Sequence, residues 1–219
     1  MKKNKLICIL ISIVVIIFCL GFNFIHAYYT NKTERVNKFK VGEIEASVTE
    51  PNYKDNEVIK PNEEITKDPT FSNTGKISSY IRAQVYVPIS KNIKYVDNNE
   101  NIVTPSEEIE ILSYKINSGW ELVTEDGFSG IYEDEEGNKY KVYTYKFMEN
   151  GNEKVINPGE TIANTLFDKV KVINYLDIDK NISIKLHVSV ISVQSEGGNA
   201  ENMWTAYKNQ NGTGIVGIK

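Results

Sequence analysis

The sequence predicts an antiparallel β-sandwich with few helices. Between Phe39 and Val193, polar and apolar residues alternate with a period of two, which is the mark of half-buried strands. Helical spacing is scarce and no internal repeat is present. Many strands with few helices favour two packed antiparallel sheets over an α/β architecture.

The two longest alternating runs predict long strands with one core face each. From Ile77 to Ile89, isoleucine, valine and alanine occupy one face, and the other carries Tyr80, Arg82, Gln84 and Tyr86. The run from 182 to 190 has the same form, and a third run from 140 to 148 leaves its buried face undecided. Shorter strands are expected at 38–49, 70–72, 109–115, 121–123 and 166–172, the first with a bulge at Gly42 and Glu43.

Two helical segments and two long connections complete the prediction. Thr104-Pro105-Ser106-Glu107 has the form of a capping box and predicts a short turn of helix. Residues 199–208 predict two to three helical turns that pack through Met203, Trp204 and Tyr207. The connections are residues 50–69 and 91–105.

The N-terminus has the pattern of an export signal. Lys2, Lys3 and Lys5 precede an uncharged, almost wholly apolar run from Leu6 to Phe22, and small Ala27 can precede the scissile bond. Ile25 stands where ordinary signals have a second small residue, so an uncleaved membrane anchor is the alternative. We therefore expect a signal peptide at 1–27, an N-terminal arm at 28–37 and one β-sandwich domain at 38–219.

Cleavage after Ala27 would change the chemical inventory. Cys8, Cys19 and His26 leave with the signal, so the mature chain would have no cysteine and one histidine, His187. Loss of three lysines takes 25 basic residues to 22 against 29 acidic ones, a formal charge of −7. An acidic secreted domain without disulfides is expected to rely on core packing and not to bind nucleic acid.

Motifs for catalysis or metal binding are missing from the sequence. A single histidine on the polar phase of its strand cannot build a two-histidine zinc site or a clear catalytic triad. Asp97-x-Asn99-x-Asn101 resembles the start of a calcium loop, but Ile102 stands at its glycine position. We expect a polar turn there, no metal, no cofactor and no enzymatic activity.

Tyrosines recur on the predicted strands at positions 80, 86, 143 and 145. Packing in the core and across strands is the expected role for most of them. Contact with a neighbouring subunit or with a polysaccharide is the alternative.

The arm from Tyr28 to Asn37 differs in kind from the rest of the chain. Its Tyr28-Tyr29-Thr30 start favours an extended strand, and no partner for it is evident in the sequence. A mobile terminus is one interpretation. Addition as a strand to the open sheet edge of another copy is the other, with Tyr28, Tyr29, Thr30, Val36 and Phe39 as the assembly residues.

An ordered set of short motifs resembles the TasA and camelysin family, whose exported members are cut by a SipW-type signal peptidase. The set covers nearly the whole chain and consists of Ala27-Tyr28-Tyr29-Thr30, Asn37-x-Phe39-x-x-Gly42, Phe71-Ser72-Asn73-Thr74-Gly75, Tyr80-Ile81-Arg82, Asn157-Pro158-Gly159-Glu160, Leu166-Phe167-Asp168-Lys169-Val170 and a terminal helix with Trp204. The resemblance implies a jelly-roll-like sandwich, secreted or held at the bacterial surface, that polymerises into biofilm-matrix fibres by donor-strand complementation.

Carried onto this sequence, the resemblance implies that cleavage between Ala27 and Tyr28 frees the donor strand. The expected partners are further copies of the chain, the signal peptidase, and accessory matrix proteins or polysaccharide, with a membrane involved only before cleavage. A surface metalloprotease, as camelysin is described, is the enzyme-class alternative. A monomeric adhesin or fibre accessory factor is the binding-class alternative.

Overall fold

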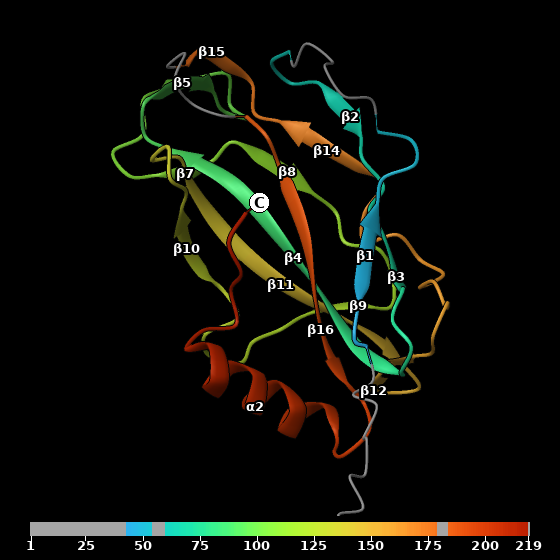
Figure 1. Cartoon of the computed structure of the whole chain (residues 1–219). Helices are drawn as coiled ribbons and strands as arrows, with labels where there is room; N and C mark the ends of the chain where they lie inside the picture. The colour runs from blue at the N-terminus through green and yellow to red at the C-terminus, as the bar shows by residue number, and fades with distance from the viewer. Residues whose placement is uncertain (1–42, 54–59, 179–183, 219) are drawn as a thin grey trace, which may run out of the picture. The chain divides into compact units, whose positions relative to one another are not determined.

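A central strand, β4 (Ser79–Ser90), organises the computed structural model, which describes residues 43–53, 60–178 and 184–218 (Figure 1). On one side β4 pairs with β11 (Lys139–Glu149), from Pro88 opposite Tyr140 to Arg82 opposite Lys146. On the other side it pairs with β16 (His187–Gln194), from Tyr86 opposite His187 to Ser79 opposite Gln194. Both pairings are antiparallel, as the alternating patterns predict.

Short strands extend this central sheet. β10 forms a hairpin with β11, and β9 and β12 also pair with β11, whereas β7 and β13 pair with β4. Their bounds are β7 (Ile109–Glu110), β9 (Trp120–Leu122), β10 (Gly130–Glu133), β12 (Asn152–Glu153) and β13 (Val155–Ile156).

Three smaller antiparallel sheets complete the all-β sandwich. One pairs β1 (Ala46–Thr49) with β3 (Thr70–Asn73). The second has the order β2-β14-β8, and the third the order β15-β5-β6. Their bounds are β2 (Glu64–Thr66), β5 (Ile93–Val96), β6 (Ile102–Val103), β8 (Leu112–Tyr114), β14 (Lys169–Val172) and β15 (Tyr175–Ile178).

The main core lies between these sheets. The face of β4 with Ile81, Ala83, Val85 and Val87 is buried there. Each large apolar side chain removed from water contributes about 1.5–3 kcal/mol before entropy is counted. The side chains that pack against this face come from strands and loops far apart in the sequence, and include Phe71, Leu112, Trp120, Phe147, Ile162, Leu166, Phe167 and Val170.

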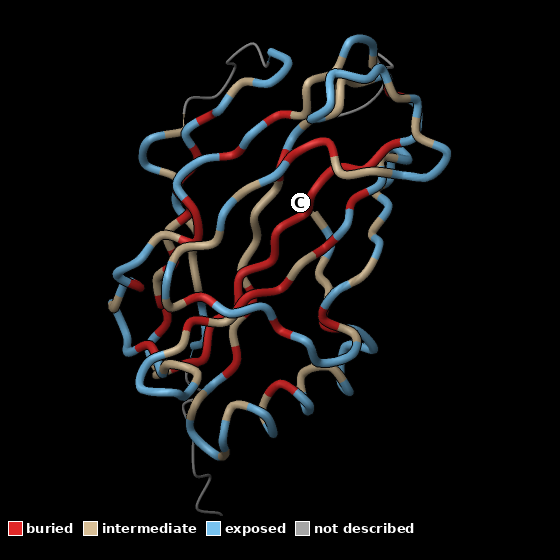
Figure 2. The backbone as a smooth tube through the Cα atoms, turned by 180° about the vertical axis from the view of Figure 1, so that it is seen from behind, coloured by how far each residue is buried: buried red, intermediate tan, exposed pale blue. Residues whose placement is uncertain are grey.

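The second face of β4 is also buried, which corrects the prediction of a single core face. Every residue of β4 is buried, and in Figure 2 the buried segments gather along the central strands. Helix α2 (Ala200–Asn211) packs over the Tyr80 end through Trp204 and Met203. The C-terminal residues 215 and 218 pack on a small cluster around Tyr86 at the other end. The C-terminal segment thus creates a second core.

The same two-sided burial resolves the ambiguous pattern of β11. Tyr140, Val142 and Thr144 are buried with the second face of the sheet, whereas Tyr145 and Phe147 belong to the main core. Tyr80, Tyr86 and Tyr145 are buried, which confirms the predicted packing role of these tyrosines.

Helix α2 confirms the predicted C-terminal helix and runs three residues further. It begins where the Asn199 side chain accepts a hydrogen bond from Asn202 N (3.0 Å), which satisfies an otherwise unpaired amide of the first turn. It ends at Gly212, whose φ of 73° is left-handed, a conformation that favours glycine. Trp204 is buried, and Met203 and Tyr207 pack beside it.

Several strand predictions need correction. Residues 104–107 form a bend between β6 and β7 in place of helix, because the β-branched and apolar residues on both sides pair as strands. The predicted 109–115 strand is split into β7 and β8 at buried Ile111, whose amide bonds to Pro88 O (3.0 Å). The connections 50–69 and 91–105 contain β2, β5 and β6. β16 begins at 187 rather than 182; residues 182–183, and 38–42 before the expected bulge at Glu43, lie outside the described residues.

An acidic turn joins the paired strands β10 and β11. In the β10–β11 turn, Asp134 Oδ1 accepts hydrogen bonds from Glu136 N (3.0 Å) and Asn138 N (2.8 Å), and Gly137 takes a left-handed φ of 83°. Hydrogen bonds from the Asn138 side chain and from these amides hold the pKa of Asp134 below its usual value. The ionised carboxylate therefore stabilises the turn more than the protonated acid does.

We predict that Asp134→Asn reduces the loss of stability in acid. A lowered pKa in the folded state means that the stabilisation is present above the ordinary value of 3.8 and disappears as the pH falls through the folded-state pKa. The free energy of unfolding, measured by urea titration between pH 7 and pH 2.5, should therefore fall less steeply below pH 4 in the variant. Glu135→Gln, the neighbouring exposed acid, is the control. Equal slopes in wild type and Asp134→Asn would contradict this role.

Candidate assembly surface

An unpaired seam lies between β16 and β1. The two strands run side by side (Figure 1), yet within the residues that the structure describes, β16 pairs only with β4 and β1 only with β3. Each strand therefore presents one row of backbone groups that has no ladder partner among the described residues. Such rows are templates for an additional strand.

Apolar side chains line this seam and are only partly covered. Val188 and Val190 of β16, and Ala46 and Val48 of β1, pack against the main core but remain half-buried. An added strand would remove more of their surface from water, at about 25 cal/mol for each Å² of apolar area. The seam therefore offers backbone pairing and apolar burial to the same occupant.

Neither seam strand carries the charges that usually block sheet edges. The sequences ASVT and HVSVISVQ contain no Asp, Glu, Lys or Arg, whereas the short strands β2, β10 and β15 carry Glu64, Glu133 and Asp177. Charged side chains on edge strands are a common protection against unwanted pairing. The seam lacks this protection.

The sequence-predicted assembly residues lie outside the described residues. Ala27 and Tyr28 at the expected cleavage site, and Tyr29, Thr30, Val36 and Phe39 of the expected assembly strand, are all in the segment before residue 43. The candidate surface that the described residues do form is the seam between β16 and β1. The sequence predicts a core strand at 182–190, and the absence of Asp, Glu, Lys and Arg from 187–194 is the sequence signal for the seam.

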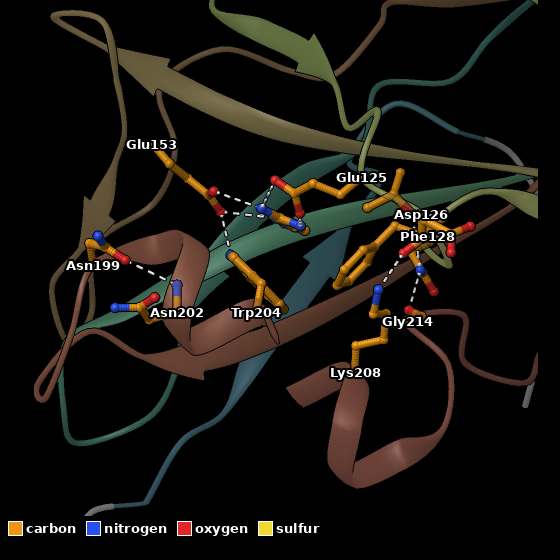
Figure 3. Close-up of polar contacts among 12 residues, drawn as sticks. Glu125, Asp126, Phe128, Glu153, Asn199, Asn202, Trp204, Lys208 and Gly214 are labelled. Atoms are coloured by element: carbon orange, nitrogen blue, oxygen red, sulfur yellow. Dashed lines mark hydrogen bonds and ion pairs between the residues drawn. The ribbon is translucent and has the colours of Figure 1, made fainter. Parts of the chain in front are cut away.

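A buried charge cluster anchors α2 near one end of the sheet (Figure 3). The Arg82 side chain, on β4, is 1% exposed. Its Nη1 donates to Glu125 Oε2 (2.7 Å), and its Nε and Nη2 donate to the two carboxylate oxygens of Glu153 (3.1 and 3.0 Å). Trp204 Nε1 of α2 donates to the same Glu153 Oε1 (2.7 Å). One carboxylate thus joins the central strand to the helix.

Aromatic rings enclose the same guanidinium. The Arg82 Cζ atom lies 4.5 Å from the centre of the Trp204 ring and 4.8 Å from that of Phe128. A charge at this depth is tolerable only when it is paired and hydrogen-bonded, and both conditions are met. We call Arg82, Glu125, Glu153, Phe128 and Trp204 the arginine clamp. Its groups are satisfied by one another, which is the arrangement of a structural anchor.

The candidates for catalysis or metal binding remain without support. His187, on the polar phase of its strand, is half-buried and meets Tyr140 edge-on, with ring centres 5.6 Å apart. Burial, followed by nearby Lys67 and Lys185, lowers its pKa, so the ring is neutral at pH 7. Asp97 Oδ1 accepts from Asn99 N (2.9 Å) and Asn101 N (2.8 Å) as a turn residue. Among the described residues, no group of three His, Cys, Asp or Glu side chains could hold a metal.

Two open hollows adjoin the outer surface of β8 and β14. Their volumes are about 540 and 550 Å³, and both include Ser113 and Lys171. Tyr114, Lys115 and Asn117 line one of them, and these side chains could bind a polar ligand.

Within the described part of the chain, no helix has the length and apolar character needed to cross a membrane.

We predict that Glu153→Gln destabilises the fold more than Glu125→Gln. The Glu153 side chain is 5% exposed and holds both Arg82 and Trp204, whereas that of Glu125 is 40% exposed. Loss of charge-assisted hydrogen bonds at the buried site should cost about 2 kcal/mol, and loss at the exposed site less than about 1 kcal/mol. Urea unfolding followed by Trp fluorescence measures both. Equal losses would show that Glu153 does not anchor the helix.

Comparisons of this chain with protein-family models, with curated proteins and with solved structures found no match. The function of the chain is therefore inferred from its own residues. Two features stand out in the described part: an uncharged, partly covered seam, and a clamped C-terminal segment.

Proposed function

We propose that this chain is an exported structural subunit that assembles into extracellular fibres by strand addition. In this proposal the signal at 1–27 is removed, and the freed arm of one copy, residues 28–37, enters the seam between β16 and β1 of the next. The observation that carries the proposal is the uncharged, half-covered seam. The likeness of the sequence motifs to the TasA and camelysin family supports the same function.

The arm is long enough to lie along β16. Cα atoms of β1 and β16 come within 8 Å of one another, whereas neighbouring strands lie about 4.8 Å apart, so β1 has to move away from β16 to admit the arm between them. Ten extended residues span about 33 Å, and the eight residues of β16 about 27 Å. The arm can therefore lie along the whole of β16, where backbone hydrogen bonds would supply affinity and the partly covered valines would receive its side chains. The Tyr28-Tyr29-Thr30 start has the aromatic and β-branched residues that favour such a strand.

In this proposal, assembly follows cleavage of the signal because the arm must be free to enter the seam. Before cleavage, the arm continues into the apolar run from Leu6 to Phe22 and is held at the membrane. A tethered arm cannot lie in a neighbour's seam, so assembly would wait for the cut after Ala27. Repetition of a head-to-tail contact of this kind yields filaments when the rotation between successive copies does not close a ring.

We predict that assembly requires both the arm and an unblocked seam. The mature chain from Tyr28 should form high-mass polymer in sedimentation velocity, and a chain without residues 28–37 should form no such polymer. Val190→Lys should also prevent polymerisation, because it places a charge at the half-buried seam. Ile131→Lys, on the exposed face of edge strand β10, is the matched control and should assemble normally.

Two outcomes would refute the proposal. One is polymer from the chain without residues 28–37. The other is normal assembly of a Val190→Lys variant whose circular dichroism shows that it is folded. A chain that stays monomeric itself but binds pre-formed fibres at a low ratio would instead identify an accessory factor.

A further inference from the structure

A groove on the second face of the central sheet is filled by the C-terminal tail, residues 213–218. The tail follows α2 and crosses in front of β4 and β11 (Figure 1). It is not part of any strand. Gly214 is buried, and Ile215, Val216 and Ile218 are half-buried. The tail therefore lies in the sheet face as an extended peptide.

Side chains of the sheet bind the backbone of this tail. Gln84 Nε2 donates to Gly214 O (2.8 Å), and Val216 N donates to Gln84 Oε1 (3.1 Å). Ile218 N donates to the Tyr132 hydroxyl (3.3 Å). Gln84 therefore uses both ends of its amide on the peptide backbone. Recognition of this kind fixes the path of a peptide without depending on its side chains.

The Tyr86 hydroxyl completes the backbone recognition. It lies 2.5 Å from Val216 O and 2.9 Å from Gln84 Oε1, and its single proton can serve one of these acceptors at a time. Burial raises the pKa of Tyr86 to about 12, so the hydroxyl keeps its proton at physiological pH. Gln84 and Tyr86 are both fully buried beneath the tail.

The side chains of the tail add selectivity. Ile215 and Ile218 pack on the cluster of Tyr86, Tyr140 and Val142, whose members are at most 1% exposed. A Cβ atom at Gly214 would come within 2.3 Å of the Phe128 ring, whereas the nearest atom to a Cβ at Gly217 is 3.4 Å away. The groove therefore requires glycine at position 214 and favours apolar residues at 215 and 218.

The connection between the helix and the groove is short. Gly212 caps α2, and Thr213 alone separates it from the first bound residue, Gly214. Short hinges beside an extended, exchangeable segment favour domain swapping between copies. An empty groove would expose the rings of Tyr86 and Tyr140, so it needs an occupant.

We propose that this groove is a peptide-binding site, and that a second copy of the chain can supply its C-terminal tail in exchange for the groove's own. The tail of the same chain competes at an effective concentration in the millimolar range. Exchange is therefore confined to crowded assemblies, where it would link copies through their C-terminal ends. This contact uses no residue of the N-terminal arm and goes beyond the proposed function.

The peptide site can be tested with a labelled synthetic peptide of sequence TGIVGIK, residues 213–219. Full mature chains that carry Gly214→Ala or Gly217→Ala are titrated with the peptide and followed by fluorescence anisotropy. The Gly214→Ala chain, whose own tail clashes with Phe128, should bind the peptide at least ten-fold more tightly than the Gly217→Ala control. A peptide with the same Gly214→Ala change should bind neither chain. Equal affinities in the two folded variants would overturn the site.

A second preparation covers the case in which Gly214→Ala does not fold. A protease site inserted after Gly212 is cut once the otherwise unaltered chain has folded, and the cut tail is then challenged with the labelled peptide. Replacement of the tail by the peptide supports the site, and retention of the original tail at every peptide concentration overturns it.

The second copy as occupant is tested with the chain that lacks residues 28–37, which cannot add an N-terminal strand. At about 1 mM it should form a dimer in sedimentation equilibrium that excess TGIVGIK peptide dissolves. A chain that stays monomeric, or a dimer that the peptide leaves intact, would overturn tail exchange between copies. Neither result depends on N-terminal strand addition.

Discussion

Arg82 lies near one end of β4, a strand that is buried on both faces, and much of the structure follows from keeping its charge there. The guanidinium requires carboxylates, which Glu125 and Glu153 supply, and it is enclosed by the rings of Phe128 and Trp204. These groups come from a loop, a short strand and the C-terminal helix. Burial of this charge without partners would cost more free energy than the whole free energy of unfolding of a small domain. The docked helix completes the clamp through Trp204, which covers the guanidinium and donates to Glu153.

The docked C-terminal segment covers the second face of the central sheet. On the second face of β4, helix α2 and the tail form another core, in which Gln84 and Tyr86 have partners on the tail. Where the edge of the central sheet meets the β1–β3 sheet, β16 and β1 are not paired with each other and carry no Asp, Glu, Lys or Arg. In the proposed assembly the added strand lies along β16, whose Ile191 is paired with Arg82 of the clamp.

The sequence predicted the fold class well and the second core poorly. Alternation in 77–89, 140–148 and 182–190 identified the central strands, and helical spacing around Trp204 identified α2. The polar face of β4 was expected to be exposed because Arg82 and Gln84 are rarely buried without partners. Those partners, Glu125 and Glu153, lie 43 and 71 residues away, a separation that local patterns do not report. The seam depends on the absence of a pairing, which only a three-dimensional arrangement can reveal.

Hydrogen exchange of the assembled protein tests the central claim most directly, because it reports where new backbone hydrogen bonds form. Amide exchange in polymer and monomer is compared by mass spectrometry of peptic fragments. Strand addition at the seam predicts slower exchange in 187–194 and 46–49 on assembly, with exchange in 130–133 of edge strand β10 unchanged. Unchanged exchange along β16 and β1, with new protection at β10, would contradict the account.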